Sequence, residues 1–375
     1  MRFCIRLSAI LAVLILLCIT GLHCEAAYDS PEDTLKEAAG ALDLPSDVQT
    51  EFDRIGISAD DPASLLSLTP DELLHTVLRY AVQELSAPLR LCGILLTLTV
   101  LASLLGCLGD AAAEGSLRSC FDLLCTLCCI GTAAGPLCDC LSRTAAALSK
   151  GQVFITGYIP VFGAFIAAGG HPASGAAYQA FVLFLTNCFM QLLNAVLYPL
   201  LQMSASIGIA DAVNPELHLS GISDGLQKAV TRILGFVMAL YSAMLSMRGI
   251  VASAADTLAS KSVKLLASGL IPIVGNAVSD AYGTVQGSIR LLRNGVGAAG
   301  ILVVLLLTLP PLLSLICYRA VFRINGIFAE IAGNSAMLRL YANMHAVLSA
   351  AFAMLVCFSV MMVISSAVTL LLLGE

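Results

Sequence analysis

The sequence predicts an all-α integral membrane protein with about eight transmembrane helices. Of its 375 residues, 58% are apolar and only 12% are charged, whereas a soluble domain carries about 25% charged residues. Apolar stretches of roughly 20 residues, the length that crosses a 30 Å hydrocarbon core, recur along the chain. This composition excludes a water-soluble enzyme. A net charge of −6 without any basic block also excludes a nucleic-acid-binding protein.

Residues 1–26 are predicted to be a secretory signal peptide. Arg2 and Arg6 form a basic start, residues 7–22 are apolar, and small residues occupy the −3 and −1 positions (Cys24 and Ala26) of a cleavage site. An uncleaved anchor helix is the alternative. Either interpretation places residues 28–85 outside the cytoplasm, because basic residues stay on the cytoplasmic side.

The next predicted unit, residues 27–86, is an acidic helical extracytoplasmic segment. Residues 25–84 contain 14 acidic residues against three basic ones. Thr69 and Glu72 form a capping box, which predicts that a helix starts at Pro70. A small docking module and a solvated spacer are equally consistent with this composition.

Residues 87–375 form the predicted polytopic membrane domain. Six uninterrupted apolar stretches have spanning length: Pro88–Leu108, Leu117–Leu137, Ala177–Leu201, Val230–Met247, Gly295–Tyr318 and His345–Leu373. Two more, Val153–Gly170 and Leu265–Gly283, contain Gly and Pro. Since Pro removes a helical hydrogen bond, we expect two broken helices, whose freed backbone groups need protein or a watery cavity.

The two Gly- and Pro-containing segments match each other at an offset of 112 residues. This offset places Pro160 and Gly163 on Pro272 and Gly275. It predicts an internal repeat of residues 153–250 and 265–365, with coincidence among apolar residues as the alternative. Three spans in each half would make the repeats inverted, as in many transporters. Two spans in each half would make them parallel.

The charges of the loops predict the orientation of the chain. In the eight-span interpretation, the acidic loop 206–229 lies outside and the basic loop 319–339 lies inside. Both mature termini would then lie outside.

A polar stripe runs along the third uninterrupted stretch. Asn187, Gln191, Asn194, Tyr198 and Gln202 are spaced 4, 3, 4 and 4, which places them on one helix face. A polar face is costly in lipid, so we expect it to face protein or a pore. Hydrogen bonding between helices and a hydrated path are the two alternatives.

The remaining polar residues predict no chemistry. Asp280, which follows the second broken segment, is either interfacial or at membrane depth. Cys125 and Cys128 lack a second ligand pair, so packing explains the cysteine cluster better than a disulfide or a metal site. The sequence contains no Walker loop and no GxSxG elbow. We therefore predict no catalytic, cofactor-binding or metal site. The candidate path or packing residues are Pro160, Gly163, Asn187, Gln191, Asn194, Gln202, Pro272, Gly275 and Asp280.

Several short motifs, in order and spacing, resemble the stage III sporulation protein AE family across residues 85–375. They are Ile159-Pro160, Ala167–Gly170, Ala173–Ala177, Ala254–Asp256, Lys264, Ile271–Gly275, Ser279-Asp280 and Arg293–Gly297. The chain departs from the family at Arg248-Gly249, where Gln-Gly is expected, and in its cysteine cluster.

The resemblance implies a non-enzymatic, multi-pass protein of the mother-cell membrane surrounding the forespore. It further implies a channel or secretion-like complex that sustains late forespore gene expression. The implied partners are other proteins of the stage III sporulation A operon and, across the intermembrane space, a forespore membrane protein. No cofactor and no nucleic acid are implied. The alternatives are a stand-alone secondary transporter for a small solute and a scaffold without conduction.

Overall fold

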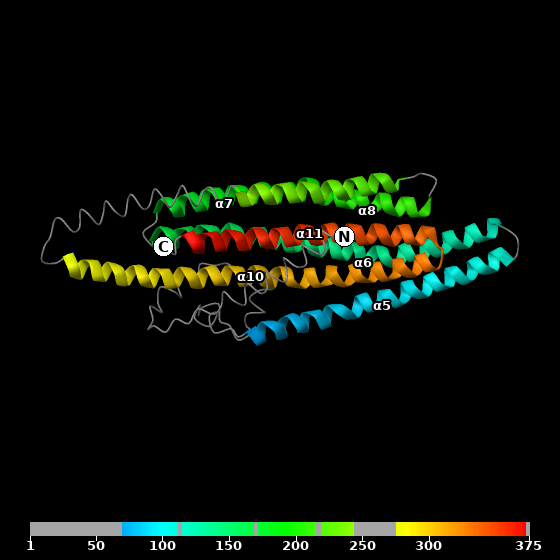
Figure 1. Ribbon diagram of the computed structural model, residues 1–375, viewed down its shortest axis with the longest axis horizontal. Coiled ribbons are helices and arrows are strands. Elements are labelled where there is room, and N and C mark those ends of the chain that lie inside the picture. Colours follow the sequence, from blue (N-terminus) through cyan, green and yellow to red (C-terminus); the bar gives the residue numbers. More distant parts are fainter. Residues whose placement is uncertain (1–69, 112–114, 169–171, 215–218, 244–274, 373–375) are drawn as a thin grey trace.

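The protein is a bundle of long helices in the computed structural model, which describes residues 70–111, 115–168, 172–214, 219–243 and 275–372. These residues form helices and no strands. The helices are α5 (Pro70–Ala111), α6 (Gly115–Ala168), α7 (Pro172–Leu192), the π-helical turn η1 (Leu193–Leu197), α8 (Tyr198–Val213), a helix over residues 220–243, α10 (Gly275–Ile331) and α11 (Ser335–Leu372). Figure 1 shows that they extend along the long axis of the molecule.

Helix α5 begins at Pro70, as the capping box predicted. It then runs without interruption through residue 86 to Ala111 and contains Pro88. The end of the acidic segment and the first apolar stretch therefore belong to one helix. The predicted signal peptide and most of the predicted acidic segment lie outside the described residues.

The expected break at Pro160 was wrong. Residues 117–137 and 153–170 were predicted as separate segments, but the single helix α6 covers residues up to Ala168 and contains both Pro136 and Pro160. A proline removes one hydrogen bond, and neighbouring helices can hold such a helix together. Here α6 packs against α5, α7, α10 and α11, which supplies that support.

The turn between α10 and α11 has a local explanation. Gly333 has a φ of +69°, which side chains disfavour. The N–H of Asn334 donates to the carbonyl of Ala329 at 3.1 Å, which is the Schellman bond that ends a helix. The Asn334 side chain then accepts from the N–H of Met337 at 3.1 Å and caps the start of α11.

The loop placement predicted from charge was also wrong. Asp211, in the last turn of α8, forms an ion pair with Arg339, in the second turn of α11. The expected outside loop 206–229 and the expected inside loop 319–339 therefore lie at the same end of the bundle, as Figure 1 shows. Most of the described residues in both expected loops are helical.

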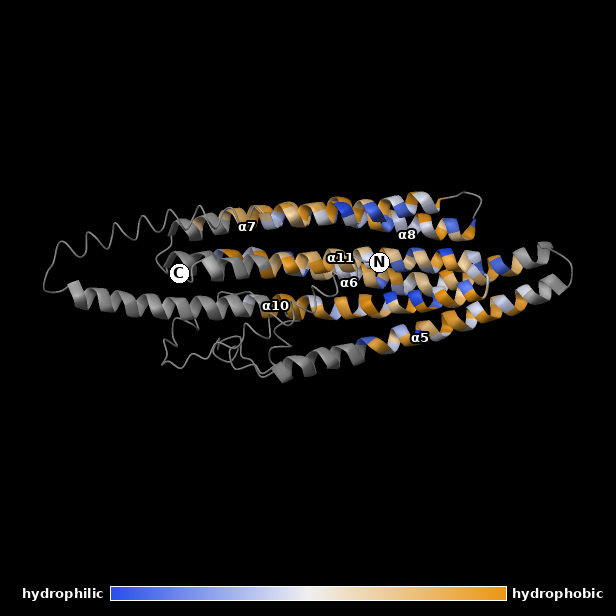
Figure 2. Ribbon diagram, in the orientation of Figure 1, coloured by the Kyte–Doolittle hydropathy of each residue, from blue (hydrophilic) through white to orange (hydrophobic). Residues whose placement is uncertain are grey.

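Five described helical stretches are long and apolar enough to cross a membrane: Glu84–Gly106, Cys120–Pro160, Ala180–Val213, Leu302–Ile331 and Ser335–Val363. The predicted count of eight is not confirmed, partly because α6 merges two of the predicted segments. The hydrophobic colouring of Figure 2 runs along these helices. Helix α10 has 57 residues, or roughly 85 Å at 1.5 Å per residue, so it exceeds the bilayer core.

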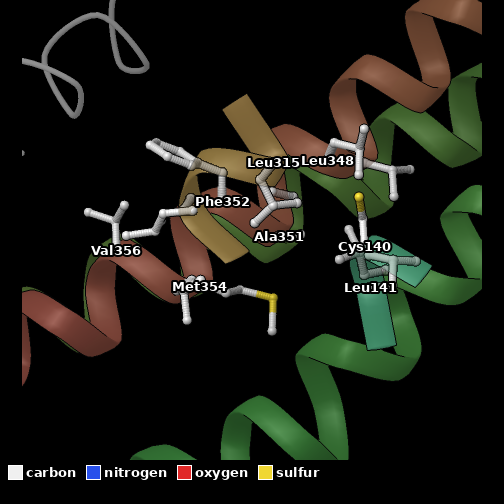
Figure 3. Packing of buried hydrophobic residues seen from close by; sticks show 14 of the residues in the cluster. Cys140, Leu141, Leu315, Leu348, Ala351, Phe352, Met354 and Val356 are labelled. Carbon is white, nitrogen blue, oxygen red and sulfur yellow. The ribbon is translucent and has the colours of Figure 1, made fainter. Parts of the chain in front are cut away.

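Helix α11 is the centre of the bundle. Every side chain from Ala350 to Ser359 is buried, and the helix packs against α10, α8 and α6. Figure 3 shows Leu348 and Phe352 of α11 near Leu315 of α10 and Cys140 of α6. A helix that is apolar all round needs either protein or lipid to cover it, and here neighbouring helices cover most of α11.

The internal repeat is not confirmed and stays a prediction. α8 and α10 end at the same end of the bundle, and each is followed by a helix that returns.

Candidate functional site

A buried polar cluster joins α8, the helix over residues 220–243, and α11. Its members are Ser204, Ser223, Gln227 and Asn343. The Oδ1 atom of Asn343 accepts from the Ser223 hydroxyl at 2.7 Å and from the Gln227 amide at 2.9 Å. The Gln227 amide also donates to the Ser204 hydroxyl at 2.9 Å. The cluster thus ties three helices together through neutral hydrogen bonds.

Gly208 makes the cluster possible. A Cβ atom at this position would overlap the amide group of Asn343, so any other residue would displace this side chain from the cluster. The Asn343 amide donates to the carbonyl of Ala205 at 3.4 Å, one turn before Gly208. The space left beside Gly208 on α8 therefore accommodates the Asn343 side chain of α11.

A charged pair closes the same end of the bundle. Asp211 is only 3% exposed, and its Oδ2 atom lies 3.5 Å from Nε of Arg339. Its Oδ1 atom accepts the N–H groups of Leu219 and Ser220 at 2.8 and 3.0 Å. Asp211 therefore caps the helix that follows α8. Removing one partner would leave a buried charge uncompensated, which is strongly destabilising.

A second polar contact lies between α5, α6 and α10. The Glu84 carboxylate accepts from Arg143 at 3.1 Å and from the Ser314 hydroxyl at 3.0 Å. A separate contact joins α5 to α11, where the Tyr341 hydroxyl of α11 lies 3.1 Å from the Thr99 hydroxyl of α5. These groups form hydrogen bonds across the helix interfaces.

The side chains of the predicted polar stripe lie on the outer surface of the helix bundle. Asn187, Gln191, Asn194 and Gln202 are all exposed, and Tyr198 is half-buried. The expectation that this face lies against protein or a pore therefore stays a prediction. Across the helix, Val182, Phe189, Leu193, Leu197 and Leu201 point into the core.

One interhelical contact anchors the stripe. The Gln152 amide of α6 donates to Asn187 at 3.5 Å. The π-helical turn η1 lies inside the stripe and exposes Asn194, Ala195 and Val196 in succession. Such turns occur mostly as single bulges, often at functional sites.

The other predicted site residues are spread over the chain. Pro160 and Gly163 lie in α6, whereas Gly275 and Asp280 lie in the first two turns of α10. Pro272 lies outside the described residues. Their role as a path stays a prediction.

Sequence reasoning missed the buried cluster, although a signal was present. Ser204, Gly208 and Asp211 are spaced 4 and 3, and both Ser223–Gln227 and Arg339–Asn343 are spaced 4. Each helix thus carries polar residues on one face. Periodicity identifies such faces, but it does not say which of them pack together.

The described cysteines are free thiols. Cys129 lies 3.3 Å from the Tyr341 hydroxyl and is fully buried, whereas Cys120, Cys128 and Cys138 are exposed. Within the described ranges, no group of three or more metal-binding side chains comes together.

Comparison with known proteins places this helical body in a sequence family. A family model described as stage III sporulation protein AE matches residues 63–372. A relative of the same description from Bacillus subtilis (strain 168) is 22% identical over 320 residues, which covers 83% of this chain and 80% of the relative. No solved structure matches.

Proposed function

This chain belongs to the stage III sporulation protein AE family, and from its sporulation role we propose that it is a membrane component of the channel or secretion-like complex joining mother cell and forespore. The observation that carries the proposal is the extent of the family match. It runs from residue 63 to residue 372 and includes every described helix.

The proposed partners are other proteins of the stage III sporulation A operon and a forespore membrane protein across the intermembrane space. The proposed location is the mother-cell membrane around the forespore, with the N-terminal segment extracytoplasmic. The polar groups described above are consistent with this role. They join helices through hydrogen bonds, as in other helical membrane proteins.

A stand-alone transporter for a small solute is the second candidate. One observation favours it: four amide side chains are exposed within the candidate span Ala180–Val213. Transfer of an amide to an apolar phase without a hydrogen-bond partner costs roughly 2–7 kcal/mol. The stripe therefore needs water or another protein surface, and water would form a path.

Gene deletion separates the two functions. Loss of a channel-complex component should block sporulation after engulfment and lower late forespore transcription, while vegetative growth stays normal. The wild-type gene restored elsewhere in the chromosome is the control. A growth defect on one nutrient, with normal spores, would refute the channel proposal and favour the transporter.

Purification from sporulating cells tests the proposed partners. The tagged full chain should bring down other products of the same operon, whereas a tagged membrane protein of vegetative cells should not. Recovery of this chain without them, at full sporulation activity, would contradict the proposal.

The path hypothesis has its own test. Gly163→Leu and Gly275→Leu should impair spore formation at normal protein level if these segments line a path. Leu at Gly131, which has open space around it, is the matched control. Wild-type sporulation in both variants would remove the path hypothesis and leave the family assignment intact.

A further inference from the structure

We propose that two copies of this chain pair side by side in the membrane through the amide stripe, which consists of Asn187, Gln191, Asn194 and Gln202. The inference goes beyond the proposed function, because pairing of copies does not depend on the identity of other partners. It rests on the position, the chemistry and the spacing of the stripe.

The position of the stripe requires a covering surface. All four side chains are exposed, although they lie in a helix with the length and composition of a membrane span. In the described part of the chain, Gln152 hydrogen-bonds to Asn187. In the described residues, no hydrogen bond reaches the side-chain amides of Gln191, Asn194 or Gln202, and Ser206 bonds to the backbone carbonyl of Gln202. Lipid tails offer such amides no partner, whereas a neighbouring helix does.

The chemistry of the stripe matches a second copy. All copies insert in the same orientation, so a two-fold axis between neighbours lies along the membrane normal, and residues face their own equivalents. Such a surface needs groups that both donate and accept hydrogen bonds, and the side chains of Asn and Gln do both. No charged residue occurs between Asn187 and Gln202, so matched copies meet without like-charge repulsion.

The spacing of the stripe matches packed parallel helices. The steps from Asn187 to Gln191, Asn194 and Tyr198 are 4, 3 and 4 residues, which is the period of the seam between two parallel helices. A buried Asn at a matched position sets the register of such pairs. The π-helical turn adds the small, exposed Ala195, which permits close approach of two backbones.

A native thiol allows a direct test. Cys188 is exposed and adjoins Asn187. In native membranes, a full-length variant that retains only Cys188 should form a disulfide-linked dimer with copper-phenanthroline. The control retains only Cys128, which is also exposed but lies on α6, and it should give background yield.

Substitution of the amides tests the chemistry. Gln191→Leu combined with Asn194→Leu should lower the dimer yield of the Cys188 variant about tenfold, because two matched pairs of hydrogen-bonding groups are lost. Thr97→Leu, at an exposed position of α5, is the matched control and should leave the yield unchanged.

Three results would overturn the proposal. The first is equal dimer yield from the Cys188 and Cys128 variants at equal expression. The second is reaction of Gln191→Cys with a membrane-impermeant thiol reagent without dimer formation, which would indicate a hydrated path. The third is cross-linking of Cys188 in sporulating cells to a different protein and never to itself.

Discussion

Gly208→Ala should destabilise the bundle by breaking the contact between α8 and α11. A new Cβ atom would overlap the Asn343 amide, so this side chain must move. It would lose its hydrogen bonds to Ser223, Gln227 and the Ala205 carbonyl. Hydrogen bonds between membrane helices contribute about 0.6 kcal/mol each, so three bonds amount to about 2 kcal/mol.

The gain in helix propensity opposes this loss. Replacing Gly by Ala inside a helix stabilises it by about 1 kcal/mol. We therefore expect Gly208→Ala to be less stable than wild type by about 1 kcal/mol. Gly225→Ala is the matched control, because nothing lies within 4 Å of its Cβ position. It should be more stable than wild type by about 1 kcal/mol.

The assay is reversible unfolding of the purified protein in detergent, followed by helical circular dichroism. The double variant Gly208→Ala, Asn343→Ala supplies a thermodynamic cycle. Because Asn343→Ala already removes the overlapping group, the two changes should cost clearly less together than the sum of the single changes. Equal stability of Gly208→Ala and Gly225→Ala, or strict additivity in the cycle, would refute the reasoning.

Asp211→Ala should lower thermal stability more than Asp211→Asn, because Asn keeps an oxygen that can accept the N–H groups of the following helix; equal melting temperatures would contradict this role. Single-cysteine labelling with an impermeant reagent should find Asn214→Cys and Glu330→Cys on one side of the membrane and Ala168→Cys on the other, since the first two positions share one end of the bundle; labelling of Asn214→Cys and Glu330→Cys from opposite sides would restore the predicted loop placement. Gly333→Ala should cost about 1 kcal/mol in the same unfolding assay, because its φ of +69° is left-handed, and Gly333→Asn should cost less; no effect of either change would contradict the strain argument.

Residue types and their spacing were enough to predict the class of the protein. A helix from Pro70 and a face shared by Asn187, Gln191 and Asn194 follow from capping and from the 3.6-residue period, which are local properties of the chain. The membrane character follows from composition, because so much apolar surface needs lipid to cover it. The order of the motifs indicated the sporulation family, which the family model confirmed.

The extent of the helices was harder to predict. Pro160 predicts a break when a helix is considered alone, yet α6 continues because neighbouring helices support it. The charged residues of 319–339 predicted a long loop, but helix α10 extends to Ile331 and α11 begins at Ser335. In both cases packing outweighed the local signal.

The sequence by itself determined that this chain is a helical membrane protein with polar faces on several helices, because those properties depend on residues close together in the chain. Only the tertiary structure decided which faces meet. It placed Asn343 against Gly208 and Asp211 against Arg339, across more than 100 residues, and it left the amide stripe outside. The physical reason is that hydropathy and periodicity describe one helix at a time, whereas the partner of a polar side chain depends on how all the helices pack together.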